Sequence, residues 1–245
     1  MTESQNTVEL LARGDDALFE GGYRSGDFAA AHELFAAAET RAAAEGDRAG
    51  EADAVYYRGL TMHYASIVRR FSGAGIDAAD IDAEEVLFRR SLALNRALAG
   101  AGVARPLFGL GLVMQVLRRD WAAAEPLFRE ALELVGGVEA QGDLYTCSEI
   151  HRHMGFFYAV QDVQLPVAIK HLELSLTFRE RLGDPRRVPS GLAALGDAHL
   201  AYGQVERAVE LFERAAQNAR EVGLLSFWIA DAERGLREAL EARDR

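Results

Sequence analysis

Several features that would assign a protein to a particular class are rare or absent in this chain of 245 residues. Cys147 is the single cysteine, so no disulfide can form within the chain and nothing indicates an oxidising compartment. No run of eighteen apolar residues occurs, which predicts that the chain does not span a membrane. Residues 1–6 are polar and lack the basic start of a secretory signal. These features predict a cytoplasmic protein without a membrane partner.

Positive charge is also scarce. The chain has 27 Lys and Arg residues against 38 Asp and Glu residues, which gives a formal net charge of −11. Nucleic-acid binding draws much of its affinity from basic residues that neutralise phosphates, so we predict no nucleic-acid partner. An acidic protein attracts basic peptides or surfaces, although physiological salt weakens this attraction.

The sequence motifs of common catalytic and cofactor sites are missing. Gly109 and Gly111 begin a GxG pattern, but Met114 occupies the third glycine slot and the segment has the pattern of a helix. The chain contains no Walker loop, GxSxG motif or HExxH motif. His151 and His153 are two positions apart, which on a helix points them away from each other. We therefore predict no catalytic residue, no cofactor and no metal site.

What the sequence does contain is a recurring pattern. A small residue is followed four positions later by Phe or Leu and, three positions after that, by another small residue. The copies begin at Ala31, Glu84, Ala124, Ala168 and Ala208. Positions four and seven apart lie on one face of an α-helix, and small residues let a neighbouring helix approach closely. A second amphipathic segment precedes each copy, so the unit is helix, turn, helix with a period of about 40, typical of a helical solenoid.

This unit resembles the tetratricopeptide repeat (TPR). The fifth copy fills nearly every signature slot of that repeat, with Leu192, Leu195, Gly196, Gly203, Ala208, Phe212 and Ala215. Residues 25–38 match the second half of the motif, whereas Glu84 departs from it because a small residue is expected there. The period is similar to that of a longer TPR variant of about 40 residues. The resemblance implies an all-α fold, a right-handed α-α superhelix of about five helix pairs.

We predict a single TPR-like domain over residues 1–245. The repeats are expected at about 8–46, 50–100, 104–136, 142–183 and 189–223, followed by a C-terminal capping helix at 224–242. Glycines are expected to end the second helices, namely Gly46, Gly100, Gly136, Gly137, Gly183 and Gly223. Residues 71–82 are rich in Gly and Ala, and we expect them to form an insertion in the second repeat, either a solvated loop or a flap.

In TPR-like proteins the first helix of each pair lines a concave groove, so the resemblance also implies which residues face a partner. The expected groove residues are Tyr56, His63, Tyr64, Arg105, Phe108, Gln115, Glu149, Arg152, Phe156 and Asp197. Aromatic side chains with a few polar groups are typical of a binding site, but the aromatics are equally compatible with a core. The Lys and Asn residues of TPR grooves that grip a C-terminal carboxylate are lacking. Arg105 and Arg152 could hold an anionic group instead.

Several functions remain open at this level. The favoured one is a non-catalytic adaptor whose groove binds a peptide or helix of a partner protein, an inference by analogy from the fold. Self-assembly, for example as a homodimer, is one alternative. Another is a small-molecule binder or sensor, with a pocket enclosed by the superhelix and residues 71–82. That pocket would be lined by Tyr56, His63, Phe108 and Phe156.

The remaining alternative is an enzyme that uses His63, Tyr64 or Glu149 as an acid or a base. Such an enzyme would need two titratable groups within about 3 Å of each other in that pocket, so that a proton could pass between them.

Overall fold

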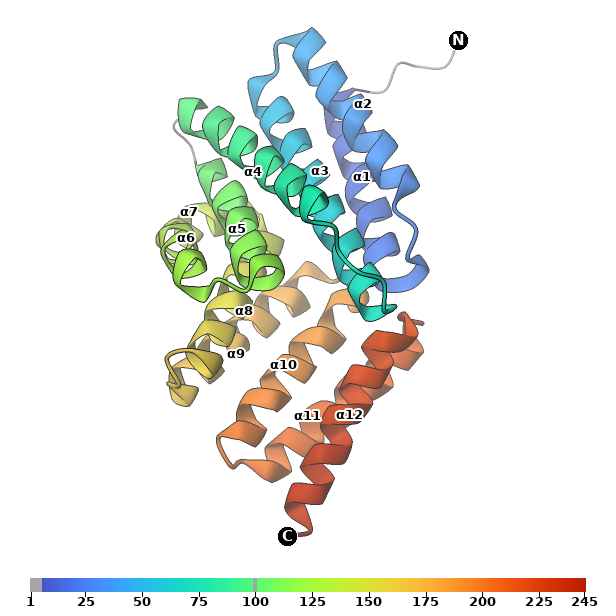
Figure 1. Cartoon of the computed structure of the whole chain (residues 1–245), viewed down its shortest axis with the longest axis vertical. Helices are drawn as coiled ribbons and strands as arrows, with labels where there is room; N and C mark the ends of the chain where they lie inside the picture. Colours follow the sequence, from blue (N-terminus) through green and yellow to red (C-terminus); the bar gives the residue numbers. More distant parts are fainter. Residues whose placement is uncertain (1–5, 99–100) are drawn as a thin grey trace. The chain divides into compact units, whose positions relative to one another are not determined.

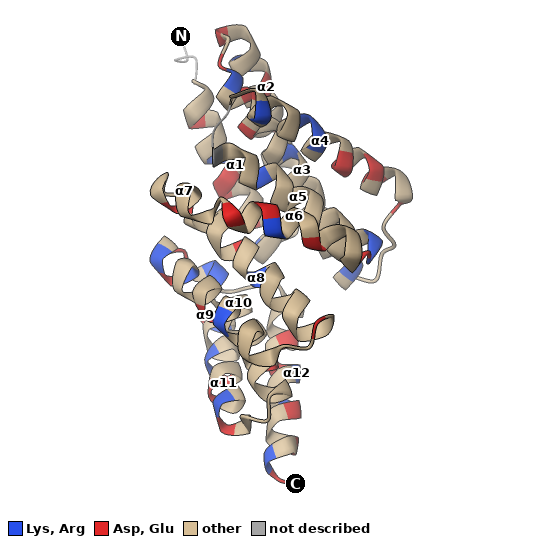
Figure 2. Ribbon diagram, turned by 90° about the vertical axis from the view of Figure 1, so that its left-hand side faces the viewer, with Lys and Arg blue, Asp and Glu red and all other residues tan. Residues whose placement is uncertain are grey.

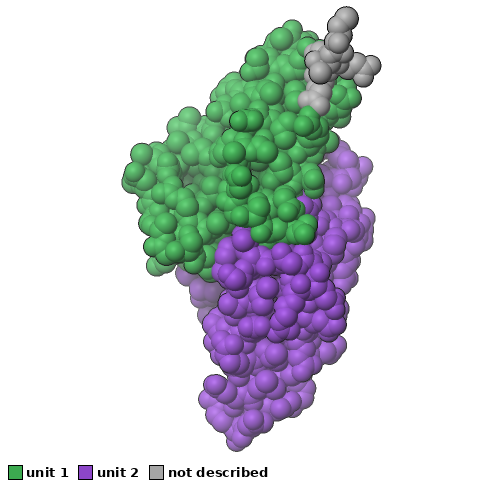
Figure 3. Space-filling model, turned by 90° about the vertical axis from the view of Figure 1, so that its right-hand side faces the viewer, with its two compact units in different colours: residues 1–131 green, residues 132–245 purple. Residues whose placement is uncertain are grey.

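The computed structural model describes residues 6–98 and 101–245, which form helices and turns without any strand (Figure 1). The helices pack in neighbouring pairs. The chain divides into two compact units, residues 1–131 and 132–245, which have different colours in Figure 3. The start of the chain before Asn6 and the predicted helix end at Gly100 lie outside the described residues.

Unit 1 contains three pairs of helices in its described part. The first two pairs are α1 (Thr7–Glu20) with α2 (Ala29–Glu45), and α3 (Arg48–Phe71) with α4 (Ala78–Leu98). The third is α5 (Ala104–Leu112) with α6 (Trp121–Glu133). Short helices of other types complete the unit, namely the π-helices η1 (Gly21–Ser25) and η3 (Val113–Arg118) and the 3₁₀ turn η2 (Ala101–Val103). The first helices α1, α3 and α5 contact one another in succession.

Unit 2 begins with a short helix, α7 (Val135–Ala140), and continues with two pairs and a final helix. The pairs are α8 (Leu144–Val160) with α9 (Leu165–Leu182), and α10 (Val188–Ala201) with α11 (Val205–Glu221). A 3₁₀ turn, η4 (Pro185–Arg187), precedes α10, and α12 (Ser226–Arg243) packs on α11 and α10. None of the described helices is both long and apolar enough to cross a membrane.

The all-α prediction is confirmed for the described residues, and α7 is a helix that none of the predicted repeats contains. One continuous right-handed superhelix and one domain over residues 1–245 stay predictions. The helix ends at Gly46, Gly183 and Gly223 are confirmed, because each glycine has a positive φ at or just after a helix end. Gly136 and Gly137 are the exception. They lie inside α7, so they do not end α6.

The recurring small residues and aromatics form the contacts between helices. Ala31 and Ala208 are fully buried. The phenylalanines of the same pattern in the first three repeats are also fully buried, namely Phe35, Phe88 and Phe128. These rings occupy space that glycines leave open on the first helices. A Cβ atom added at Gly111 would lie 2.3 Å from the ring of Phe128, and one at Gly59 would lie 2.9 Å from Phe88. The repeat pattern is therefore a close-packing pattern.

The structure corrects the prediction for residues 71–82. The α3 helix runs to Phe71 and α4 begins at Ala78, so only residues 72–77 are non-helical. The Asp77 carboxylate accepts a hydrogen bond from the backbone N–H of Ala79 at 3.2 Å, and the Arg69 guanidinium donates to the carbonyl of Gly75 at 3.1 Å. The extra residues thus lengthen two helices around a short turn, and they form no flap.

Candidate functional site

The predicted groove residues differ widely in exposure. Five are buried, namely Tyr56, His63, Phe108, Gln115 and Glu149. Four are partly exposed, namely Tyr64, Arg105, Arg152 and Phe156, and Asp197 is exposed. Buried side chains cannot contact a partner without opening the core, so this difference decides which predicted residues remain candidates.

The prediction that Tyr56 and Phe108 line an open groove is wrong. Tyr56 is 1% exposed, and its ring centroid lies 5.8 Å from that of Phe88. Phe108 has no exposed surface, and its ring centroid lies 6.2 Å from that of Phe128. Both rings fill space between the helices of unit 1, because a first helix contacts several neighbours and has little free surface.

His63 is likewise held inside unit 1. Its Nδ1 atom lies 2.8 Å from the Oε1 atom of Glu84, which is fully buried. A buried carboxylate requires a polar partner, and His63 supplies one from α3. This pair explains why the second repeat tolerates Glu84 where a small residue is expected. The two groups are close enough for proton exchange, but a substrate could reach Glu84 only if α3 and α4 separated.

Tyr64 and Arg105 also have partners within unit 1. The Tyr64 ring centroid lies 5.6 Å from that of Phe19 and 6.1 Å from that of Tyr23. Arg105 forms an ion pair with Asp53 at 2.6 Å, which links α5 to α3. Arg105 is therefore already paired with a carboxylate, and its predicted use as half of an anion clamp stays untested.

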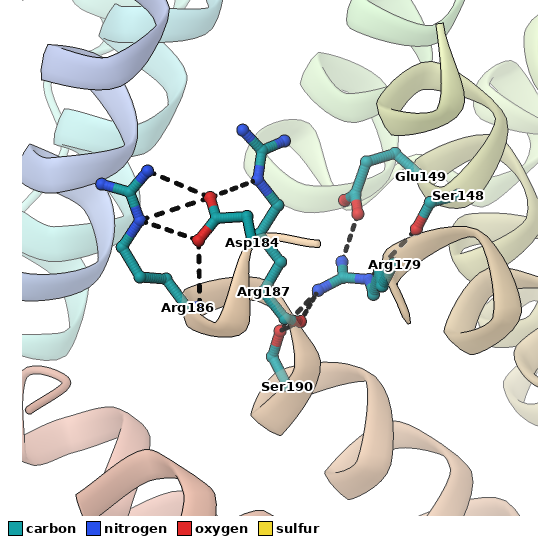
Figure 4. Close-up of polar contacts among 7 residues, drawn as sticks. All are labelled: Ser148, Glu149, Arg179, Asp184, Arg186, Arg187 and Ser190. Atoms are coloured by element: carbon teal, nitrogen blue, oxygen red, sulfur yellow. Dashed lines mark hydrogen bonds and ion pairs between the residues drawn. The ribbon is translucent and has the colours of Figure 1, made fainter. Parts of the chain in front are cut away.

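Glu149 belongs to a buried polar network in unit 2, shown in Figure 4. The guanidinium of Arg179, which is 1% exposed, pairs with the Glu149 carboxylate. It also donates to the hydroxyls of Ser148 at 3.1 Å and Ser190 at 2.8 Å, and to the carbonyl of Arg187. The prediction that Glu149 faces a groove is therefore wrong. A buried charge persists only when it is paired and hydrogen-bonded, so this network ties α8 and α9 to the start of α10.

A second group in Figure 4 fixes the turn that precedes α10. Asp184 accepts hydrogen bonds from the side chain of Arg186 at 2.9 Å and from Arg187 Nε at 3.0 Å. Burial acts to raise the pKa of Asp184, but these hydrogen bonds outweigh it and hold the pKa below its usual value. The Arg187 guanidinium lies 4.7 Å from the ring centroid of Tyr145. Both contacts are structural, since they join neighbouring elements of unit 2.

The two histidines of α8 have separate surroundings. His151 Nδ1 lies 2.9 Å from Nδ1 of His171, on α9. Burial, with a smaller contribution from His171, lowers the pKa of His151 to about 4, so this ring is neutral at neutral pH. His153 packs instead edge-on against Phe156. Over residues 6–98 and 101–245, no three His, Cys, Asp or Glu side chains converge to hold a metal ion.

Cys147 is buried on α8. Burial, with a smaller contribution from Asp143, raises the pKa of its thiol to about 12. The thiol stays protonated at neutral pH and is a poor nucleophile.

The predicted groove residues of unit 2 that are at least partly exposed include Asp197, on α10. The α10 helix is buried almost throughout, and among residues 188–200, all of them described, only Asp197 is exposed. Asp197 is also the only Asp, Glu, Lys or Arg residue of α10, which is drawn almost entirely in tan in Figure 2. Its electrostatic neighbours come from α8 and α12. We define the Asp197 cluster as Asp197 with Arg152, Phe156, Asp231, Arg234 and Glu238.

Most members of the Asp197 cluster have partners. The Arg152 guanidinium lies 4.8 Å from the ring centroid of Phe156, one turn further along α8. Arg234 donates to Asp231 at 2.7 Å and to Glu238 at 3.0 Å along one face of α12. Asp197 forms no hydrogen bond or ion pair with any residue that the structure describes, and the Nε atom of Arg152 is likewise buried without a hydrogen-bond partner.

Asp197 has two properties that need a common explanation. Its side chain is exposed to solvent, yet burial among the surrounding helices raises its pKa to about 6, with a further contribution from Asp231. Arg234 and Arg152 oppose this shift. A recessed position accounts for both properties, since water reaches the carboxylate while nearby protein atoms limit its hydration.

Sequence reasoning identified only half of this cluster. Arg152, Phe156 and Asp197 are among the predicted groove residues, and the structure brings them together in unit 2. The residues of α12 were missed because that helix was interpreted only as a cap. The spacing of Asp231, Arg234 and Glu238, three and then four residues apart, places them on one helix face and could have revealed them.

These features define an all-helical protein of packed helix pairs, with the Asp197 cluster in unit 2. No protein-family model matches the chain, and neither does any curated protein sequence. The solved structure of BtubC (BKLC) from P. vanneervenii is similar to it, with 16% sequence identity and a TM-score of 0.50. The similarity covers 89% of this chain and 93% of that one. At this identity it concerns the fold alone.

Proposed function

We propose that the chain is a non-catalytic, TPR-like binding module that holds a peptide or helix of a partner protein against its first helices. The Asp197 cluster is the observation that carries this proposal. It combines a partly exposed aromatic ring with charged groups from α8, α10 and α12, and such a combination is typical of binding sites. In each unit the first helices contact one another in succession, as expected for the inner wall of a superhelix, which supports this arrangement.

The charges on the second helices support the same conclusion by contrast. On these helices, several charged side chains pair with neighbours on the same helix, as in Arg89 with Glu85, Arg129 with Glu125, and Arg207 with Glu210. Pairs three or four residues apart are typical of a solvated helix face and need no external partner. Asp197 has no such neighbour, so its carboxylate is available for a contact from outside the chain.

The two other classes of function have less support. A small-molecule pocket would need Tyr56 and Phe108, which are buried in the core, and a flap at residues 71–82, which are mostly helical. An enzyme would need its acid–base pair to be open to a substrate. His63 and Glu84 lie at a suitable distance, but they are 5% and 0% exposed.

Affinity capture from native lysate tests the proposal. The protein is compared with the double variant Arg152→Glu/Phe156→Ala, and the control is Arg207→Glu, which makes the same charge change on α11. We expect one partner protein to bind the original chain and the control, and to lose at least about 10-fold in affinity for the double variant. Circular dichroism checks that helical content is kept. Equal capture by all three proteins, or a tightly bound small molecule in place of a protein, contradicts the proposal.

A further inference from the structure

We propose that the Asp197 cluster recognises a basic side chain, an arginine or a lysine, on the partner segment. This inference rests on the proposed function, because it requires a segment that lies across α8, α10 and α12. The cation would contact the Asp197 carboxylate. Phe156 packs against the apolar core of unit 2, and the Arg152 guanidinium lies over its ring.

The bonding within the cluster points to a cation. Arg234 is already bonded to Asp231 and Glu238, and Arg152 lies over Phe156. Neither arginine forms an ion pair with Asp197. The cluster contains three carboxylates against two guanidinium groups, so one negative charge remains uncompensated when all are ionised. A guanidinium or ammonium group from outside would supply the missing partner.

The electrostatic state of Asp197 supports the same chemistry. Its pKa is raised to about 6, chiefly by burial, so the ionised carboxylate is poorly stabilised by its surroundings. A cation within hydrogen-bond distance favours the ionised form, and charge-assisted hydrogen bonds are among the strongest in proteins. An acidic residue at the same place would add like charge to a poorly hydrated carboxylate. The cluster therefore also discriminates against acidic segments.

Selection from a random peptide library displayed on phage provides the test. The library is selected in parallel against the original chain and against Asp197→Asn, which keeps the shape of the side chain and removes its charge. We expect peptides selected by the original chain to share an arginine or lysine at one position. Synthetic copies should bind Asp197→Asn at least about 10-fold more weakly. The control is Glu213→Gln, which removes a carboxylate from the exposed side of α11 and should leave binding unchanged.

A second measurement shows whether the two charges meet. In one selected peptide, the shared arginine is replaced by citrulline, which has nearly the same shape without the charge. Binding to the original chain should fall by about the same factor as on Asp197→Asn. Binding to Asp197→Asn should barely change, since the partner charge is already gone.

The outcomes separate the two proposals. If the selected peptides lack a common basic residue, or bind Asp197→Asn as tightly as the original chain, the basic-residue inference is wrong while the binding function stands. Acidic peptides held through Arg152 or Arg234 would overturn it in the same way. If no peptide binds the original chain and the lysate yields no partner, the proposed function itself fails.

Discussion

The second helices of the repeats form two kinds of interface, one made by alanine and one by polar side chains. In α2, α6 and α11 the second small position of the repeat is Ala38, Ala131 and Ala215. In α4 and α9 it is Ser91 and Ser175. Four residues later the contrast recurs, with Asn95 and Arg179 set against Ala42, Val135 and Ala219. All ten residues are buried, so one packing register accommodates both types of chemistry.

The two polar helices also differ from each other. On α4, Asn95 donates to the carbonyl of Ser91 within the same helix, and Ser91 donates to the carbonyl of Ala52 at 2.9 Å. On α9, Arg179 reaches two other elements and carries a full charge. The stability of an alanine interface comes from close packing, whereas a buried charge is stable only when all of its hydrogen-bond and ion-pair partners are present. Unit 2 should therefore be more sensitive to single polar substitutions than unit 1.

Removal of Arg179 should have the largest effect. Arg179→Ala leaves the Glu149 carboxylate buried without its cation, and we expect a loss of about 3–5 kcal/mol in the free energy of unfolding. Urea denaturation measures it. The control Arg181→Ala breaks an exposed ion pair with Glu139 and should cost less than about 1 kcal/mol. Similar losses for the two variants would contradict the assigned role of the network.

Acid should also weaken unit 2 through His151. The folded protein holds the pKa of His151 at about 4, below its usual value of about 6.5, so the folded state binds a proton less readily than the unfolded state. Stability should therefore fall as pH decreases from about 6.5 to 4, by about 3 kcal/mol. Thermal unfolding of the original chain and of His151→Phe across this range measures the difference. A pH dependence unchanged in the variant would show that other groups cause it.

The polar pair of unit 1 should matter less. Glu84→Ala restores the small residue of the repeat but leaves His63 without its partner, and we expect a loss of about 1–3 kcal/mol in urea denaturation. The double variant His63→Leu/Glu84→Ala should recover part of this loss, because it removes both polar groups. A loss as large as that of Arg179→Ala would contradict the expectation that unit 2 is more sensitive to polar substitutions than unit 1.

The smallest expected effect is a gain in stability. Because the folded state raises the pKa of Asp197 to about 6, it binds a proton more readily than the unfolded state, and this residue costs stability as pH rises from about 4 to 6. Asp197→Asn should stabilise the chain at neutral pH by about 1 kcal/mol, a figure reduced to allow for the exposure of the side chain. The gain should disappear below about pH 4. Destabilisation at neutral pH would instead indicate a structural role for the carboxylate.

Much of the fold could be predicted because the spacing of residues in the repeat shows which side chains pack between helices. Ala31 and Phe35 are spaced for one helix face, and the glycines with positive φ mark where most second helices end. Residues 71–82 were interpreted as an insertion from their Gly and Ala content. Asp77 instead begins a helix, because its carboxylate accepts a hydrogen bond from the backbone N–H of Ala79.

The candidate site could be predicted only in part. Periodicity shows which residues share a helix face, but it does not show how many neighbours cover that face. Tyr56 and Phe108 therefore looked available, although α3 and α5 contact other helices on several sides. A charged residue such as Arg179 would be taken as solvated, and only the proximity of Glu149 reveals that it is buried. Such information lies in tertiary contacts between distant residues.

The inert state of Cys147 gives the chain a practical advantage. A maleimide dye reacts with thiolates, and this buried thiol offers almost none at neutral pH. A reporter cysteine could therefore be introduced at Ala201, an exposed position one helical turn from Asp197, without altering the natural cysteine. Fluorescence from that single label would then signal when a partner segment arrives beside α10.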